Sequence, residues 1–168
     1  MSQNFKPIVV VVSSIILCCL LMLSRLSGMG LVGITPNWFL MWLVIWSVRR
    51  NLWQSLVAGV SLGLLWDSLS GGFPTHIIGL IVIALLTANV YQGAYIKEDI
   101  ISMLLIVFGM VIMSETVIAI QYSIQTDIPL TDIWLKYQQN SLASAIITSL
   151  WTPLLYYPLN QLLQKERR

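Results

Sequence analysis

Two acidic side chains lie inside apolar stretches that are long enough to cross a membrane. Asp67 falls near the end of one stretch, and Glu115 lies about two-thirds of the way along another. A carboxyl group at the centre of a membrane helix costs about 2.5–3.5 kcal/mol, and less near the interface. Acids kept at such positions usually serve a function. Both are candidates for docking a partner, for lining one polar pocket with Ser114 and His76, or for a proton pathway.

The residue types give little support for catalysis. The chain has one histidine, His76, and it lacks a Ser-His-Asp constellation, a phosphate-binding loop and a Cys/His cluster. His76 is either a proton-sensitive contact or, more simply, a polar residue that starts a helix at the membrane interface. Cys18 and Cys19 are adjacent, so on a helix they point apart and make a poor disulfide or metal pair. We expect no enzyme activity, cofactor, metal or nucleic-acid partner.

Composition assigns the chain to the integral membrane proteins. Of its 168 residues, 57% are hydrophobic and only 10% are charged, and the mean hydropathy is +0.82. A soluble domain has about 25% charged residues, so this chain could not cover a globular surface with polar groups. The sequence therefore predicts an all-α membrane protein with a single domain, residues 1–168.

Six apolar stretches are predicted to form transmembrane helices, since a span needs about 20 residues. They cover residues 8–23, 31–48, 52–69, 77–91, 100–121 and 142–161. If the second stretch, which contains Pro36, did not span, the protein would have five spans and an outer N-terminus. Six spans are preferred, because Trp38–Val48 is almost entirely apolar and an unpaired loop cannot lie in lipid. The amphipathic segment 126–137, in the longest connection, is expected to form a short interfacial helix.

The basic residues predict the orientation. With six spans and an inner N-terminus, seven Lys and Arg residues fall on one side and two on the other. The inner seven are Lys6, Arg49, Arg50, Lys97, Lys165, Arg167 and Arg168, and the outer two are Arg25 and Lys136. Both termini are therefore expected in the cytoplasm. Cleavage of the first stretch as a signal peptide is not expected, because Ser24–Gly28 lacks a small-x-small site.

A regular spacing gives the third stretch one distinctive face. Gly59, Gly63 and Asp67 follow each other at intervals of four, so they share a helical face, and the glycines let another helix approach closely. That helix could belong to this chain or to another protein. Asp67 could fix the loop that follows it or contact a partner, and the two interpretations carry equal weight. The loop holds three further candidate residues, Gly71, Gly72 and Pro74.

A tryptophan stripe marks the second stretch. Trp38, Trp42 and Trp46 recur every four residues on one face. Interfacial tryptophans ordinarily lie at the ends of a span, whereas Trp42 should lie near mid-depth. We expect the stripe to pack against another helix, with exposure to lipid as the alternative.

These features resemble the MreD family of rod shape-determining membrane proteins. The resemblance rests on the run Gly63–Gly72 and the following Pro74, on Pro36-Asn37-Trp38, and on the small six-span plan. Family members often have glycine soon after the loop proline, where this chain has Thr75 and His76. The combination with Glu115 is similar to the cyanobacterial branch of the family.

The resemblance implies a non-enzymatic scaffold of the cell-wall elongation machinery in the bacterial inner membrane. Its partners would be MreC, the actin-like MreB indirectly, the glycosyltransferase RodA and a penicillin-binding transpeptidase. The fold would resemble the six-helix substrate-binding subunits of energy-coupling-factor transporters. Such a small-molecule-binding subunit is the alternative function, although residues 8–23 lack the Ala-xxx-Ala pattern typical of its first span. An ion- or proton-conducting protein is a third, less favoured, interpretation.

Overall fold

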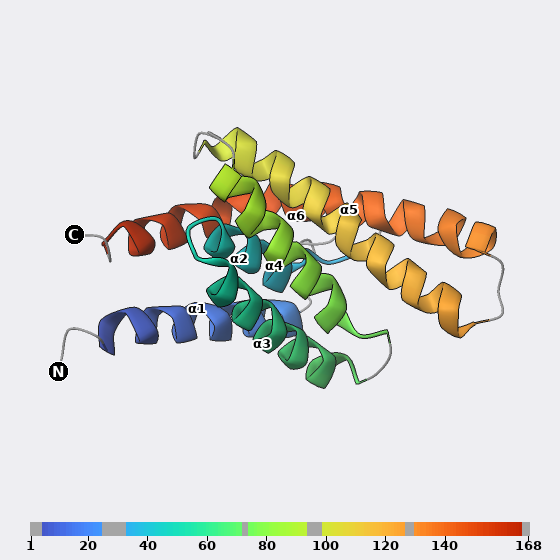
Figure 1. Ribbon diagram of the computed structural model, residues 1–168, viewed down its shortest axis with the longest axis horizontal. Coiled ribbons are helices and arrows are strands. Elements are labelled where there is room, and N and C mark those ends of the chain that lie inside the picture. Colours follow the sequence, from blue (N-terminus) through green and yellow to red (C-terminus); the bar gives the residue numbers. More distant parts are fainter. Residues whose placement is uncertain (1–4, 25–32, 72–73, 94–98, 127–129, 166–168) are drawn as a thin grey trace.

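The computed structural model describes residues 5–24, 33–71, 74–93, 99–126 and 130–165, and these residues form six α-helices. The helices are α1 (Phe5–Ser24), α2 (Trp38–Ser47), α3 (Leu52–Ser70), α4 (His76–Gly93), α5 (Ile100–Gln125) and α6 (Leu130–Lys165). Successive helices run in opposite directions, so α1 begins and α6 ends at the same end of the bundle (Figure 1). The predicted all-α fold is confirmed.

The short helix α2 lies at the centre of the bundle and contacts each of the other five helices. Nine of its 10 residues are buried, because other helices cover it on every side. With about 1.5 Å of rise per residue, α2 is about 15 Å long, half the thickness of the hydrocarbon core. It is therefore shorter than the predicted span 31–48. Residues 33–37 are not helical, and residues 31 and 32 lie outside the described part of the chain.

The non-helical segment before α2 is held by the protein around it. The side-chain oxygen of Asn37 accepts a hydrogen bond from the backbone N–H of Leu40 at 3.0 Å and so caps α2. The backbone N–H of Asn37 donates to the hydroxyl of Thr148, in α6, also at 3.0 Å. Irregular backbone is tolerated at membrane depth where protein surrounds it. The number of membrane crossings stays a prediction.

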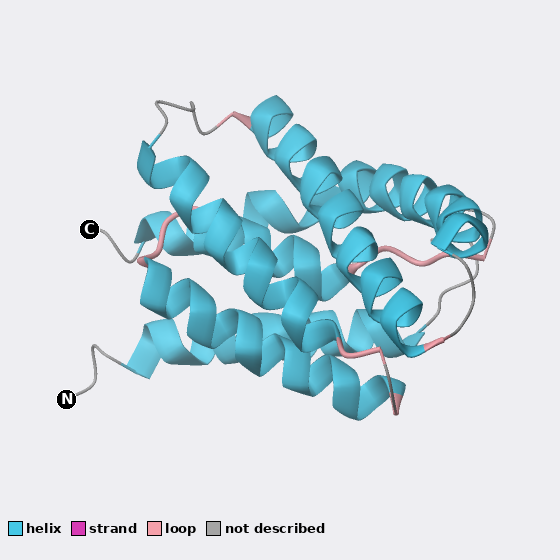
Figure 2. Ribbon diagram, turned by 45° about the vertical axis from the view of Figure 1, so that its right-hand side comes forward, coloured by secondary structure: helices cyan, strands magenta, loops and turns pink. Residues whose placement is uncertain are grey.

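Helices α5 and α6 pack against each other and extend beyond the rest of the bundle at one end (Figures 1 and 2). Among the described residues, α5 and the Thr131–Gln161 part of α6 are long and apolar enough to cross a membrane. The separate interfacial helix predicted over 126–137 is wrong, because residues 130–137 are the first turns of α6 itself. Neither glycine nor proline interrupts the chain from Leu130 to Thr152, so the helix continues through the polar residues in between.

Large apolar side chains are exposed along the outside of the bundle. Leu20 of α1 is 58% exposed, Trp53 of α3 78% and Leu105 of α5 67%. A protein surrounded by water rarely exposes so much apolar surface on so many helices. This surface is suited to lipid.

Candidate functional site

Gly59 and Gly63 place α3 directly against the backbone of α4. A Cβ atom added at Gly63 would lie 2.6 Å from the Cα of Ile77, and one added at Gly59 would lie 3.0 Å from the carbonyl oxygen of Leu80. Only glycine allows two helix backbones to come this close. The spacing left open whether the approaching helix belongs to this chain or to another protein. In the structure it is α4 of the same chain.

Asp67, one turn beyond Gly63, fixes the beginning of α4. Its Oδ1 accepts a hydrogen bond from the backbone N–H of His76 at 2.8 Å and a second from the ring Nδ1 at 2.9 Å. Because the carboxylate accepts at Nδ1, a neutral His76 ring keeps its lone pair on Nε2. The side chains of His76 and Asp67 are only 17% and 19% exposed. This geometry gives Asp67 a local role in the connection between α3 and α4.

The ring of His76 also packs against Trp66. The two rings are stacked, with centroids 4.3 Å apart and planes 7° from parallel. Trp66 in turn contacts Phe39 of α2, with ring centroids 5.9 Å apart. The first residue of α4 is therefore held by a carboxylate and an aromatic ring, and this cluster reaches the central helix.

Gly71 ends α3 in the conformation that its sequence suggests. Its φ of 72° lies in the left-handed region, and its N–H donates to the carbonyl oxygen of Asp67 at 3.0 Å. This arrangement is a common helix C-terminus and favours glycine. Pro74 is buried, whereas Gly72 lies outside the described residues.

A second pair of hydrogen bonds attaches the same connection to α5. The N–H of Thr75 donates to Oε1 of Gln121 at 3.1 Å, and Nε2 of Gln121 donates to the carbonyl oxygen of Thr75 at 3.0 Å. Sequence analysis missed both residues. The signal was the periodicity of α5, whose buried face includes polar Gln121. That face consists of Met103, Val107, Val111, Ser114, Ile118, Ala119 and Gln121.

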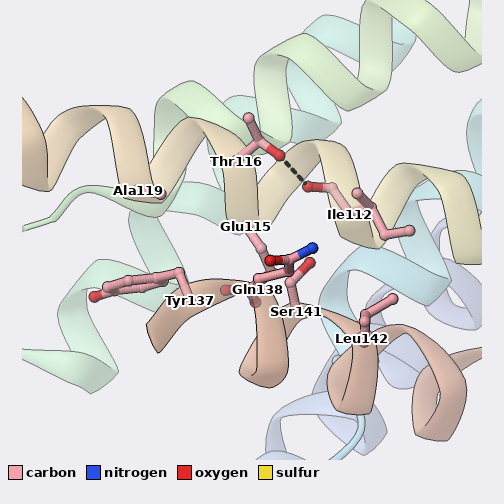
Figure 3. A pocket seen from close by; sticks show the side chains of 8 residues that line it. All are labelled: Ile112, Glu115, Thr116, Ala119, Tyr137, Gln138, Ser141 and Leu142. Carbon is pink, nitrogen blue, oxygen red and sulfur yellow. Dashed lines mark hydrogen bonds between the residues drawn. The ribbon is translucent and has the colours of Figure 1, made fainter. Parts of the chain in front are cut away.

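Glu115 lies in different surroundings. It lines a pocket of about 160 Å³ between α5 and α6 (Figure 3). The other lining residues are Ile112, Thr116, Ala119, Tyr137, Gln138, Ser141 and Leu142. Asp67 and His76 are not among them, and Ser114 instead packs against Gly79, where an added Cβ would lie 3.1 Å from its Oγ. This pocket therefore does not bring Glu115 together with Asp67, Ser114 and His76.

Two tryptophans of the stripe, Trp38 and Trp42, lie inside the bundle and join α2 to two other helices, whereas Trp46 is partly buried. Trp38 and Trp42 are each 1% exposed. Trp38 packs edge-on against Trp151 of α6, with ring centroids 5.9 Å apart. The indole Nε1 of Trp42 donates to the hydroxyl of Ser14, in α1, at 2.9 Å. Trp46 stacks on Trp42 with centroids 5.5 Å apart.

The polar contacts at these places join one helix to another or cap a helix. Within the part of the chain that the structure describes, no three His, Cys, Asp or Glu side chains are grouped so that they could hold a metal ion. Asp67 is hydrogen-bonded to His76, and Gln121 is hydrogen-bonded to Thr75. These contacts define a class of protein, a helical membrane bundle whose intramembrane polar residues fix its own architecture.

The chain belongs to the MreD family. Residues 3–166 match the model of this family, described as rod shape-determining protein MreD. No curated protein and no solved structure gives a match. The family resemblance inferred from the sequence is thus confirmed. The protein is a non-enzymatic, rod shape-determining membrane protein, and its family implies the Mre/Rod machinery.

Proposed function

We propose that the protein is a membrane scaffold that binds MreC and links the MreB filament to peptidoglycan synthesis. RodA and a penicillin-binding transpeptidase are the synthases that it serves. The family match over nearly the whole chain supports this role. Residues that looked capable of chemistry act as helix caps and inter-helix contacts, which suits a scaffold.

The observation that carries the proposal is the double attachment of the connection between α3 and α4. Asp67 holds His76 at the start of α4, and Gln121 of α5 holds Thr75 just before it. A docking surface gains affinity when its backbone is fixed before the partner arrives. The outer end of α3 and α4 is therefore the preorganised part of the scaffold.

We place both termini in the cytoplasm, with six membrane crossings. The alternating helices put the start of α1, the turn between α2 and α3, and the end of α6 at one end of the bundle (Figure 1). That turn carries Arg49 and Arg50, in agreement with the rule that short cytoplasmic loops are basic. Reporter fusions after α3 and after α4 test this orientation. Equal cytoplasmic activity of both fusions would contradict it.

We also propose that the bundle has the fold of energy-coupling-factor substrate-binding subunits. We further propose, because of Glu115, that the protein belongs to the cyanobacterial branch of the family. The six-helix plan supports the first assignment, and an acid in the second half of α5 supports the second. A family alignment with an acid at this position throughout all branches would remove the branch assignment. An experimental structure with a different helix order would remove the fold assignment.

Co-purification from native membranes tests the scaffold role. Affinity-tagged protein, extracted in mild detergent, should bring down MreC, RodA and the transpeptidase, identified by mass spectrometry. An unrelated multi-span protein with the same tag is the control. Recovery of an ATP-driven transporter module without MreC or wall synthases would overturn the proposal and favour a small-molecule-binding subunit. Depletion should cost the cells their shape, and cells that keep shape and wall insertion would contradict the role.

A further inference from the structure

The pocket between α5 and α6 takes no part in the proposed scaffold contacts. Its volume of about 160 Å³ is close to that of a cavity that accepts a benzene-sized molecule, about 150 Å³. The group that fits is therefore small, such as part of a lipid headgroup. A neighbouring helix, about 10 Å across, is too wide.

One side of the pocket is polar and the rest is apolar. Glu115 extends from α5 toward Gln138 and Ser141 of α6, and these three side chains lie next to one another (Figure 3). Ile112, Ala119 and Leu142 supply apolar walls. Such a combination, an apolar cleft with a few convergent polar groups, is typical of small-molecule sites.

The carboxyl group of Glu115 receives no hydrogen bond within the described residues, although Gln138 and Ser141 beside it carry groups that can donate. The hydroxyl of Tyr137 is engaged with Tyr122. No lysine or arginine is among the described residues that line the pocket. A carboxylate without a donor or a cation is unfavourable in apolar surroundings, so a donor brought from outside would stabilise it.

The surface around the pocket is one that meets lipid. Leu142, which lines the pocket, is 45% exposed, and Ile146 on the next turn of α6 is also 45% exposed. Glu115 follows Ile100, the first residue of α5, by 15 positions, or about 22 Å along the helix axis. In a hydrocarbon core about 30 Å thick, that depth lies in the outer half, about 8 Å from the headgroups and within reach of a lipid headgroup that enters the pocket.

We propose that this pocket binds the headgroup of a membrane lipid that donates hydrogen bonds from an amine or from hydroxyls. Glu115 accepts from the donor, while Gln138 and Ser141 accept or donate beside it. A headgroup whose outermost group is anionic is disfavoured, because like charges repel and none of the described lining residues is a cation that would compensate. The site is independent of the scaffold role, since a lipid can bind whether or not MreC does.

Lipid retention by the full-length protein tests the proposal. Delipidated protein is incubated with equal amounts of four lipids, phosphatidylethanolamine, a monoglycosyl diacylglycerol, phosphatidylcholine and phosphatidic acid, and the bound lipid is measured by native mass spectrometry. At least one of the first two should be retained about tenfold better than phosphatidylcholine, whose headgroup has no N–H or O–H donor. Equal retention of all four by the wild-type protein would overturn the proposal without any variant.

Two substitutions locate the site. Glu115→Gln keeps a carbonyl acceptor and loses the charge, so it should abolish a preference for the amine and leave a preference for hydroxyls largely intact. Leu142→Trp should fill the pocket and abolish either preference, while Leu150→Trp, at a position 68% exposed and outside the lining, is the matched control. A preference unchanged in both Glu115→Gln and Leu142→Trp would place the lipid elsewhere and overturn the proposal.

Discussion

Oδ1 of Asp67 accepts both the backbone N–H of His76 at 2.8 Å and the ring Nδ1–H of His76 at 2.9 Å. Hydrogen bonds to an ionised acceptor are about twice as strong as neutral ones, so the two bonds offset much of the cost of a carboxylate near the membrane. The stacked ring of Trp66 keeps His76 in this position. Asp67, the acid in the run Gly63–Gly72 on which the family resemblance rests, therefore has its hydrogen-bond partner inside the chain.

Replacing Asp67 with alanine should lower the free energy of unfolding by about 1–3 kcal/mol. The substitution removes a helix cap and a charge-assisted bond to the ring. Asp67→Asn keeps an acceptor oxygen and should recover about half of the loss. Thermal unfolding in detergent measures the effect. Asp99→Ala is the matched control, because Asp99 caps α5 by accepting from the N–H of its neighbour Ile100 at 2.8 Å and bonds to no second helix among the described residues.

Asp67→Ala also tests whether the fixed connection between α3 and α4 is needed for binding MreC. Asp67→Ala should enter the membrane normally and bring down less MreC than Asp99→Ala does. Wild-type amounts of MreC with a less stable Asp67→Ala protein would limit Asp67 to a local structural role. Unchanged stability would show that the hydrogen bonds to His76 contribute nothing measurable.

A methyl group at Gly63 should separate α3 from α4. The added Cβ would lie 2.6 Å from the Cα of Ile77, and since backbone cannot give way cheaply, Gly63→Ala should cost about 1–3 kcal/mol. Gly59→Ala should cost less, because its closest atom is the carbonyl oxygen of Leu80 at 3.0 Å. Gly63→Leu should be worse than either alanine variant.

Gly109 of α5 is the control for this series. Nothing lies within 4 Å of a Cβ added there, so Gly109→Ala should be neutral or stabilise by up to about 1 kcal/mol through helix propensity. Chemical unfolding of the three alanine variants in one detergent gives the comparison. A cost at Gly109 equal to that at Gly63 would mean that the close approach of the two helices does not set the stability.

Hydropathy predicted the bounds of a helix well only where the whole apolar stretch is helical. The third stretch was expected over 52–69, and α3 covers Leu52–Ser70. The second stretch was expected over 31–48, yet α2 covers only Trp38–Ser47. Hydropathy reports which side chains avoid water and does not report where a helix begins, and the non-helical residues Pro36 and Asn37 before α2 are buried like the helix that follows them. The polar start of α6 was expected to be a separate interfacial helix, because its low hydropathy sets it apart from the apolar stretch that follows, yet both belong to one helix.

Contacts between distant parts of the chain could not be predicted. The spacing of Gly59, Gly63 and Asp67 correctly placed them on one face, because that depends only on helix geometry. Thr75 and Gln121 are 46 positions apart, and Asn37 and Thr148 are 111 apart. A single sequence shows that such residues are polar and gives no sign of which pairs meet.

Removing the side-chain amide of Gln121 should release the connection before α4. Gln121→Leu deletes both hydrogen bonds to the backbone of Thr75, which we expect to cost about 1–2 kcal/mol in total. Hydrogen exchange at the Thr75 amide should become faster, because its acceptor is gone. Gln125→Leu, at an exposed position one turn further along α5, is the control. Unchanged exchange at Thr75 in Gln121→Leu would contradict the double attachment.

Replacing a tryptophan of α2 with phenylalanine should change the free energy of unfolding differently at Trp42 and at Trp46, one turn apart. Trp42→Phe removes the indole N–H that donates to Ser14 at 2.9 Å, which should cost about 0.5–1.5 kcal/mol. The Nε1 of Trp46 is buried and has no hydrogen-bond partner among the described residues, so Trp46→Phe should be neutral or stabilising, apart from the packing that the smaller ring gives up.

A double-mutant cycle separates the hydrogen bond of Trp42 from its packing. Ser14→Ala removes the acceptor and leaves the indole in place, so Trp42→Phe and Ser14→Ala should be less than additive by roughly the strength of the bond. Ser13→Ala is the control, because Ser13, within the described part of the chain, donates to the carbonyl oxygen of Val10 in its own helix and to no other helix. Additive costs for Trp42→Phe and Ser14→Ala would show that α1 is held to α2 by apolar packing alone. Coupling only with Ser14 would identify this bond as the polar link between the first helix and the central one.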